Sequence, residues 1–174
     1  MKLANAALFG ACLIAASPAA AMDLTSPDIH NGAVAPMTIL KGECGGKNIA
    51  PALSWSGAPK ETKSFIAMLY DPDAKPIGWY HWIVLNIPAN VTSLAKGGKL
   101  PAGAVAATND FGKARYDGPC PPKGDPAHHY QFQVWAVDAP AYEYGPDMMK
   151  GNVITPWMRT HGIGKGQITV TYGR

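Results

Sequence analysis

The hydrophobic pattern along this chain is that of short β-strands. Apolar, aromatic and β-branched residues gather in three runs bounded by proline, glycine and aspartate: KSFIAMLY (63–70), HWIVLNI (81–87) and YQFQVWAV (130–137). Such runs are typical of strands that lie against a core. They predict three strands of one sheet.

Alternation shows which faces these strands present. In the run 130–137 every second residue from Tyr130 falls on one face of a strand, and every second residue from Gln131 falls on the other. Both faces carry large side chains, so the strand is either half-buried or packed on both sides. The run QITVTY (167–172) alternates in the same way and is expected to close the sheet.

Helices are expected to be few, because 19 glycines and 16 prolines favour short strands joined by shaped loops. One helix signal stands out in TPWMRTHG (155–162), with Thr155 as N-cap, Pro156 in the first helical position and Gly162 as the stop. A second short turn is possible at 147–150. The chain is therefore predicted to be all-β dominated: a single-domain antiparallel β-sandwich with one or two short peripheral helices.

The N-terminal segment has the organisation of a secretory signal peptide. Lys2 supplies a positive charge, residues 6–16 form an apolar core, and 19–21 are three alanines of the cleavage-site type. The alternative is a membrane anchor, but the apolar run is shorter than the roughly 20 residues that span a bilayer. We therefore expect a signal peptide at 1–21, a mature domain at 22–174 and no stable membrane insertion.

Composition and motifs narrow the function classes. Charged residues make up 16% of the chain and the net charge is +3, so no strong field favours nucleic acid as a partner. The sequence contains no GxSxG, HExxH, Walker or GxGxxG signature. We expect neither an enzyme nor a resident cofactor.

Two cysteines, Cys44 and Cys120, remain after removal of the predicted signal peptide. An even pair in an oxidising compartment favours an intramolecular disulfide. The alternative is a reactive thiol at Cys120.

The first candidate site residues follow the run 63–70. Asp71 and Asp73 flank a proline that ends this strand, and His81 begins the next. One interpretation is a solvated turn, since Asp and Pro are common turn residues. The other is that the two acids orient and charge His81, raise its pKa, and receive the ammonium end of a zwitterion such as phosphoethanolamine.

The second candidate group follows the long stretch 109–126, which carries no strand pattern. His128 and Tyr130 stand two apart and so point to one face of a strand, while His129 points to the other. An imidazole and a phenol on one face offer donors to a phosphate or carboxylate. The alternative is that both are ordinary residues at a sheet margin.

Longer motifs connect the two groups. An acidic turn runs into a histidine-bearing strand in DPDAKPIGWYHWIVLN (71–86), and a proline-rich loop runs into a strand that opens HxY in GPCPPKGDPAHHYQF (118–132). With NIAPALSWSGAP (48–59) and TYGR (171–174), they resemble the phosphatidylethanolamine-binding protein family, specifically its bacterial Raf-kinase-inhibitor-like branch. The resemblance implies a sandwich fold and an anion-binding pocket. The pocket residues that it implies are Asp71, Asp73, Trp79 at the rim, His81, Pro121, His128 and Tyr130.

The resulting expectation is a secreted, periplasmic, non-enzymatic binding protein. Its ligand is expected to be a small anion: phosphate, a carboxylate or a phosphoethanolamine head group. Lys75 departs from the family pattern and bears on ligand identity. Two alternatives remain: an inhibitor of a protease or kinase that acts through surface loops, and a metal-assisted hydrolase using His81, His128 and Asp71. His30 and His161 have no nearby acid in the sequence and are expected at the surface.

Overall fold

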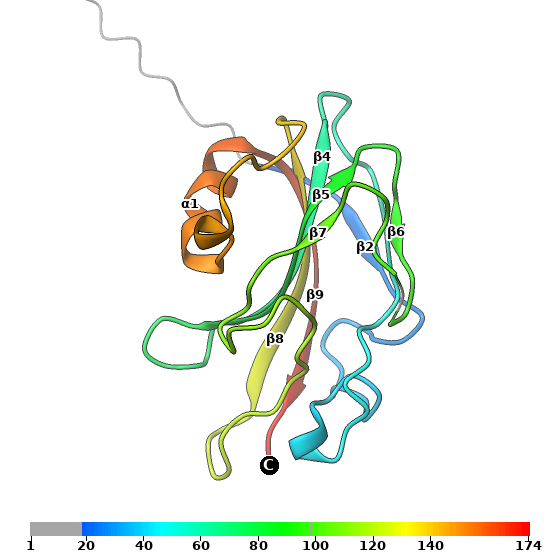
Figure 1. Cartoon of the computed structure of the whole chain (residues 1–174). Helices are drawn as coiled ribbons and strands as arrows, with labels where there is room; N and C mark the ends of the chain where they lie inside the picture. The colour runs from blue at the N-terminus through cyan, green and yellow to red at the C-terminus, as the bar shows by residue number, and fades with distance from the viewer. Residues whose placement is uncertain (1–18, 98) are drawn as a thin grey trace, which may run out of the picture.

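The computed structural model describes residues 19–97 and 99–174. Strands dominate it, and they form two sheets with one α-helix packed outside (Figure 1). The strands are β1 Ala20–Ala21, β2 Asp23–Thr25, β3 Leu53–Ser56, β4 Ser64–Asp71, β5 Trp79–Pro88, β6 Ser93–Leu94, β7 Val105–Ala106, β8 His128–Val137 and β9 Gly162–Tyr172. The helices are α1 Gly151–His161 and two 3-10 turns, η1 Gly42–Cys44 and η2 Pro146–Met148.

The larger sheet has the order β1-β9-β8-β4-β5-β7, and the smaller has the order β2-β3-β6. All pairings except that of β1 with β9 are antiparallel, as the sequence predicts for its main strands. The predicted strands are confirmed, with β4 shifted by one residue to end at Asp71 and with β5 and β8 beginning earlier, at Trp79 and His128. These added residues are candidate site residues, so the site lies at the ends of three neighbouring strands.

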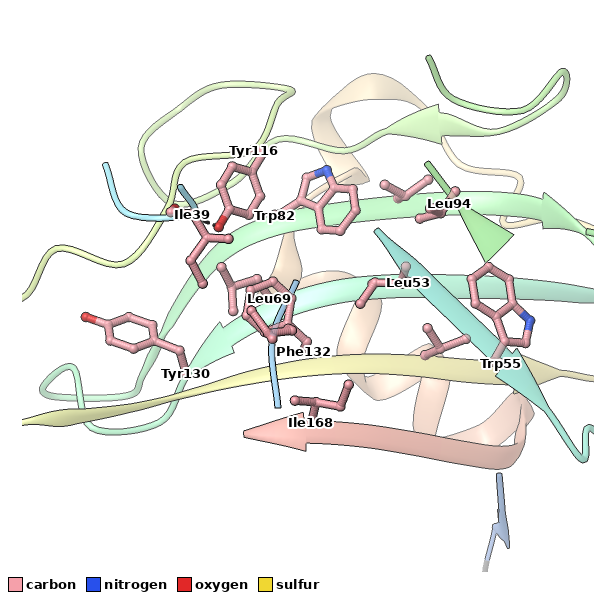
Figure 2. Close-up of a cluster of buried hydrophobic side chains, with 14 of the residues drawn as sticks. Ile39, Leu53, Trp55, Leu69, Trp82, Leu94, Tyr116, Tyr130, Phe132 and Ile168 are labelled. Carbon is pink, nitrogen blue, oxygen red and sulfur yellow. Dashed lines mark hydrogen bonds between the residues drawn. The ribbon is translucent and has the colours of Figure 1, made fainter. Parts of the chain in front are cut away.

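The main core lies between the two sheets. Leu53 and Trp55 of β3 face Leu69 and Phe132 of the larger sheet, and all four are buried (Figure 2). The ring of Trp55 meets that of Phe65 edge-on at 5.4 Å between centroids. This layered packing confirms the predicted sandwich.

Helix α1 covers the opposite face of the larger sheet, and the prediction of its start is wrong. The helix begins at Gly151 rather than at the predicted N-cap Thr155, so Pro156 lies inside it. Burial explains the early start, because Ile154 and Met158 pack against the outer face of the sheet in a second core cluster. Gly162 does end the helix, as predicted.

The predicted signal peptide falls almost entirely on residues 1–18, which lie outside the described residues. Ala20 and Ala21 pair with Gly164 and Lys165 at the edge of the larger sheet, and Met22 is buried. Among the residues that the structure describes, no helix has the length and apolar character needed to cross a membrane.

Cys44 and Cys120 form the predicted disulfide, with 5.7 Å between their Cα atoms. The bridge joins η1 to the loop before β8 across 76 residues of sequence. Nearby, the Gly118 N–H donates to Asn48 Oδ1 at 2.8 Å. One disulfide and one hydrogen bond thus hold the loop before β8 against the N-terminal part of the domain.

Gly118→Ala is expected to destabilise the protein by about 1–3 kcal/mol, because a Cβ at this position would lie 1.9 Å from the Ile39 carbonyl oxygen. Gly145→Ala is the matched control: its φ is −62° and no atom lies within 4 Å of the added Cβ, so a change within about 0.5 kcal/mol is expected. Urea unfolding of both variants measures the difference. Equal losses would show that the backbone does not approach Gly118 closely.

Candidate functional site

A cavity of about 370 Å³ opens where β4, β5 and β8 meet the loop before β8. The structure brings together around this cavity all seven pocket residues that the family resemblance implies: Asp71, Asp73, Trp79, His81, Pro121, His128 and Tyr130. Lys75 also lines it, at the turn after β4. Trp82, the other tryptophan near His81, points instead into the core between the sheets (Figure 2).

Asp71 is the anchor of this site. It is 2% exposed, and its Oδ2 accepts a hydrogen bond from His128 Nδ1 at 2.7 Å. Its Oδ1 accepts from the backbone N–H groups of Asp73 and Ala74, at 2.9 and 3.3 Å. The predicted partner of Asp71 was His81, and this is wrong: the carboxylate orients His128. The other ring nitrogen of His128, Nε2, lies 3.8 Å from Oδ2 of Asp125, which also lines the cavity.

His81 is held by the backbone instead. Its Nδ1 lies 2.9 Å from the carbonyl oxygen of Asp117, which can only accept, so Nδ1 carries the proton and Nε2 has a lone pair in the neutral ring. Burial lowers the pKa of His81, although the Asp117 carbonyl and the charge of Asp71 oppose the shift. The predicted rise is therefore wrong, because loss of solvent outweighs the nearby acid.

Asp73 binds the histidine on the other face of β8. Both the backbone N–H and the ring Nδ1 of His129 donate to Asp73 Oδ2, at 2.7 and 2.8 Å. Burial by itself would raise the pKa of Asp73, but these hydrogen bonds from His129 lower it overall. Asp73 therefore ties the turn after β4 to the start of β8 rather than orienting His81.

Two hydrogen-bond donors in the cavity wall have no partner. Within the described part of the chain, three buried polar side-chain atoms make no hydrogen bond, and two of them, Tyr130 Oη and Trp79 Nε1, belong to residues that line this cavity. Tyr130 Oη lies close enough to the Asp71 carboxylate and the Cys120 backbone for both to act on its pKa as weak hydrogen-bonding neighbours, but neither contact has the distance and angles of a formed hydrogen bond. Burial raises the pKa of Tyr130, so the phenol stays protonated. Unpaired buried donors are costly, and an acceptor in the cavity would relieve that cost.

Several contributors to the site have no clear signal in the sequence. Phe111 lines the cavity, with its ring 5.3 Å from that of His81 and 5.5 Å from that of Trp79. Asn109 positions this loop, because its Nδ2 donates to the backbone oxygen of His81 and to Asp117 Oδ2, both at 3.0 Å. Neither residue belongs to a short motif, although both lie in the long strandless stretch that the sequence marks as unusual.

Pro121 lines the cavity, whereas His30 and His161 lie away from it. Pro121 forms part of the cavity wall beside the disulfide, and its carbonyl accepts a hydrogen bond from Arg174 Nε at 2.8 Å. His30 is exposed, as expected. His161 is 35% exposed, and it has an acid partner that is distant in sequence, since its Nδ1 lies 2.8 Å from Asp138 Oδ1. Across residues 19–97 and 99–174, no cluster of three or more His, Cys, Asp or Glu side chains has a metal-binding arrangement.

Comparison with known proteins agrees with this geometry. The sequence model described as "Phosphatidylethanolamine-binding protein" matches residues 25–173. The chain belongs to the phosphatidylethanolamine-binding protein family. It is similar to the UPF0098 protein YbcL of Escherichia coli (strain K12), with 43% identity over 163 residues that cover 88% of each chain. It is also similar to the UPF0098 protein YbhB of the same strain, with 42% identity over 125 residues, which are 67% of this chain and 78% of YbhB.

Solved structures of family members share the fold. The crystal structure of E. coli YbcL, described as a member of the mammalian PEBP family, superposes with a TM-score of 0.83 at 41% identity, covering 88% of this chain and 98% of YbcL. A putative PEBP homolog from Chlamydia trachomatis gives a TM-score of 0.74 at 32% identity, with the same coverage of both chains. The recognition of the family and of its β-rich fold from sequence is thus confirmed.

The lowered pKa of His81 predicts a pH dependence of stability. The unfolded chain takes up a proton on this histidine near pH 6.5, while the folded protein resists it, so the free energy of unfolding should fall as the pH drops below about 6.5. His81→Asn keeps a donor for the Asp117 carbonyl and removes the titration. Wild type should therefore lose stability relative to this variant between pH 7 and pH 5, at a slope of at most about 1.4 kcal/mol per pH unit.

Chemical denaturation at a series of pH values, in buffers free of phosphate and carboxylate, measures this difference. Titration of all other groups cancels between the two proteins. Parallel stability curves would mean that His81 titrates equally in the folded and unfolded chains.

Proposed function

We propose that the protein is a secreted, periplasmic, non-enzymatic binding protein whose cavity takes a small phosphorylated or carboxylated anion. The observation that supports this most strongly is a pair of unpartnered donors, Tyr130 Oη and Trp79 Nε1, on two residues that line the same cavity. An indole N–H can only donate, and a phenol of raised pKa keeps its proton. Both groups therefore suit a ligand rich in acceptor oxygens.

The two imidazoles complete the proposed contacts. The Nδ1 atoms of His81 and His128 are committed to Asp117 and Asp71, so each ring has only Nε2 left for a ligand. A neutral Nε2 accepts a hydrogen bond, for example from the O–H of a monohydrogen phosphate ester. A protonated Nε2 donates a hydrogen bond to an oxyanion. Because burial lowers the pKa of His81, the neutral form meets the ligand at pH 7. Binding of a fully ionised phosphate should then be accompanied by proton uptake.

The acids are compatible with an anion because most of their charge is engaged. Asp71 is compensated by three donors, and Asp73 by the backbone and ring of His129. Asp73 and Asp125 both line the cavity with side chains that are 41% and 49% exposed. Their carboxylates at the mouth are the groups best placed to meet the ammonium end of a zwitterionic head group such as phosphoethanolamine.

Tyr130→Phe should weaken phosphate binding by about 1.5–3 kcal/mol, the range for a hydrogen bond to a charged group, because it removes the donor and leaves the ring packing in place. Tyr144→Phe, at a tyrosine that is 50% exposed and does not line the cavity, is the matched control and should leave affinity unchanged. Isothermal titration calorimetry with inorganic phosphate and with phosphoethanolamine measures both. Wild-type affinity for both ligands should also fall as the pH rises, because binding that is accompanied by proton uptake weakens at higher pH.

Unchanged affinity in Tyr130→Phe would place the anion elsewhere. It would then favour the alternative of an interaction protein that acts through surface loops. In that case the turn after β4 is the first candidate, since its Ile77 is 78% exposed and stands two residues from both Lys75 and Trp79, which line the cavity.

A further inference from the structure

A second cavity lies on the other side of the larger sheet. It measures about 240 Å³ and is bounded by α1 and by the outer face of β4, β5, β8 and β9. Side chains alternate between the faces of a strand, so Gln131 and Gln133 of β8 line this cavity while His128 and Tyr130 line the first. The sheet therefore separates the two cavities, and α1, which lies on one side of the sheet (Figure 1), lines only the second.

The charge of this second cavity is uncompensated. Its lining includes Lys165 of β9 and Arg159 of α1, and it includes no carboxylate. Neither cation forms an ion pair within the described residues; Lys165 Nζ lies over the ring of Trp135, 5.0 Å from its centroid. Burial lowers the pKa of Lys165, with no acid to oppose the shift. A partly buried ammonium that lines the same cavity as a guanidinium, with no carboxylate among the lining residues, indicates a site for a negative charge.

A directed chain of hydrogen bonds ends at the same place. Trp135 Nε1 donates to Gln133 Oε1 at 2.9 Å, and Gln133 Nε2 donates to Gln131 Oε1 at 2.8 Å. An indole can only donate, so it fixes the orientation of both amides. The chain therefore leaves Gln131 Nε2 as a free donor among the described residues, and each bond polarises the next in the direction that strengthens this donor.

The remainder of the cavity wall is apolar and aromatic. Met68 and Met158 face it from the sheet and from α1, and the rings of Tyr70 and Tyr80 pack at 4.7 Å between centroids. The hydroxyl of Tyr70 donates to the Ile77 carbonyl, and that of Tyr80 is hydrogen-bonded to Thr155. These hydroxyls are therefore committed, and the rings offer carbon surface to an occupant.

We propose that this cavity is a second binding site, for a small amphipathic monoanion with an oxyanion at one end and an aromatic or apolar group at the other. The oxyanion lies between Lys165, Arg159 and Gln131 Nε2. The apolar part packs on the methionines and tyrosine rings. The volume of about 240 Å³ accommodates a small aromatic acid such as benzoate. This site is independent of the anion proposed for the first cavity, since none of its lining residues belongs to that cavity.

Titration of the ¹⁵N-labelled protein with benzoate tests the proposal, because the indole N–H of Trp135 reports on the cavity. A saturable shift of this resonance is expected with benzoate and none with benzamide, its neutral counterpart. Phenyl phosphate tested alongside identifies the head group, and a response to either oxyanion supports the site. Saturating inorganic phosphate in the first cavity should leave the benzoate response unchanged.

Lys165→Met should weaken benzoate binding at least tenfold, since it retains the apolar stem and removes the charge. Lys60→Met, whose side chain is 92% exposed and remote from the cavity lining, is the matched control and should bind as wild type. Arg159→Gln, on the exposed side of α1, provides a second variant that does not disturb the sheet and should also weaken binding. Equal responses to benzoate and benzamide, or full affinity in both Lys165→Met and Arg159→Gln, would overturn the proposal.

Discussion

The buried hydrogen bond between the Asp71 carboxylate and the His128 imidazole is the interaction on which the site depends. The two residues are 57 positions apart, and they lie at the end of β4 and the start of β8. A carboxylate that is 2% exposed is tolerated only when its oxygens are satisfied, and here the imidazole and two backbone N–H groups satisfy them. One carboxylate therefore ends a strand, shapes the following turn and orients the ring that faces the cavity. It also fixes the start of β8, and with it the position of Tyr130 two residues later.

Strand alternation then divides the chemistry of the larger sheet between its faces. Even-numbered positions of β8 contribute His128 and Tyr130 to one cavity, while odd-numbered positions contribute Gln131 and Gln133 to the other. On both faces the decisive groups are donors without protein acceptors: Tyr130 Oη on one, and the cations with Gln131 Nε2 on the other. Our two proposals therefore place an anion on each face, by different means. The first site would use neutral donors and imidazoles, and the second would use a lysine and an arginine.

Much of this architecture could be predicted from the sequence because it depends on local patterns. Strand runs, the helix stop at Gly162 and the shared face of His128 and Tyr130 follow from periodicity and chain stereochemistry. The start of α1 could not be predicted, because burial of Ile154 and Met158 against the sheet overrides the helix-start signal at Pro156.

Which acid pairs with which histidine could not be predicted from the sequence either. Asp71 and Asp73 precede His81 by few residues, which suggests a local pair, yet they bind His128 and His129 across the sheet. Sequence distance is a poor guide where antiparallel strands bring remote residues together. Likewise, the direction of the pKa shift of His81 depends on how completely the fold buries it, and this is a property of packing rather than of neighbours in sequence.

The central claim is that the unpartnered donors of the first cavity hold an anion. A crystal structure of the protein grown without oxyanions and then soaked in phosphate tests it most directly. We predict tetrahedral density within hydrogen-bond distance of Tyr130 Oη and of the Nε2 atom of at least one of His81 and His128, with the bond between Asp71 and His128 retained. A cavity that holds only water under a soak that saturates the protein in solution would contradict the account.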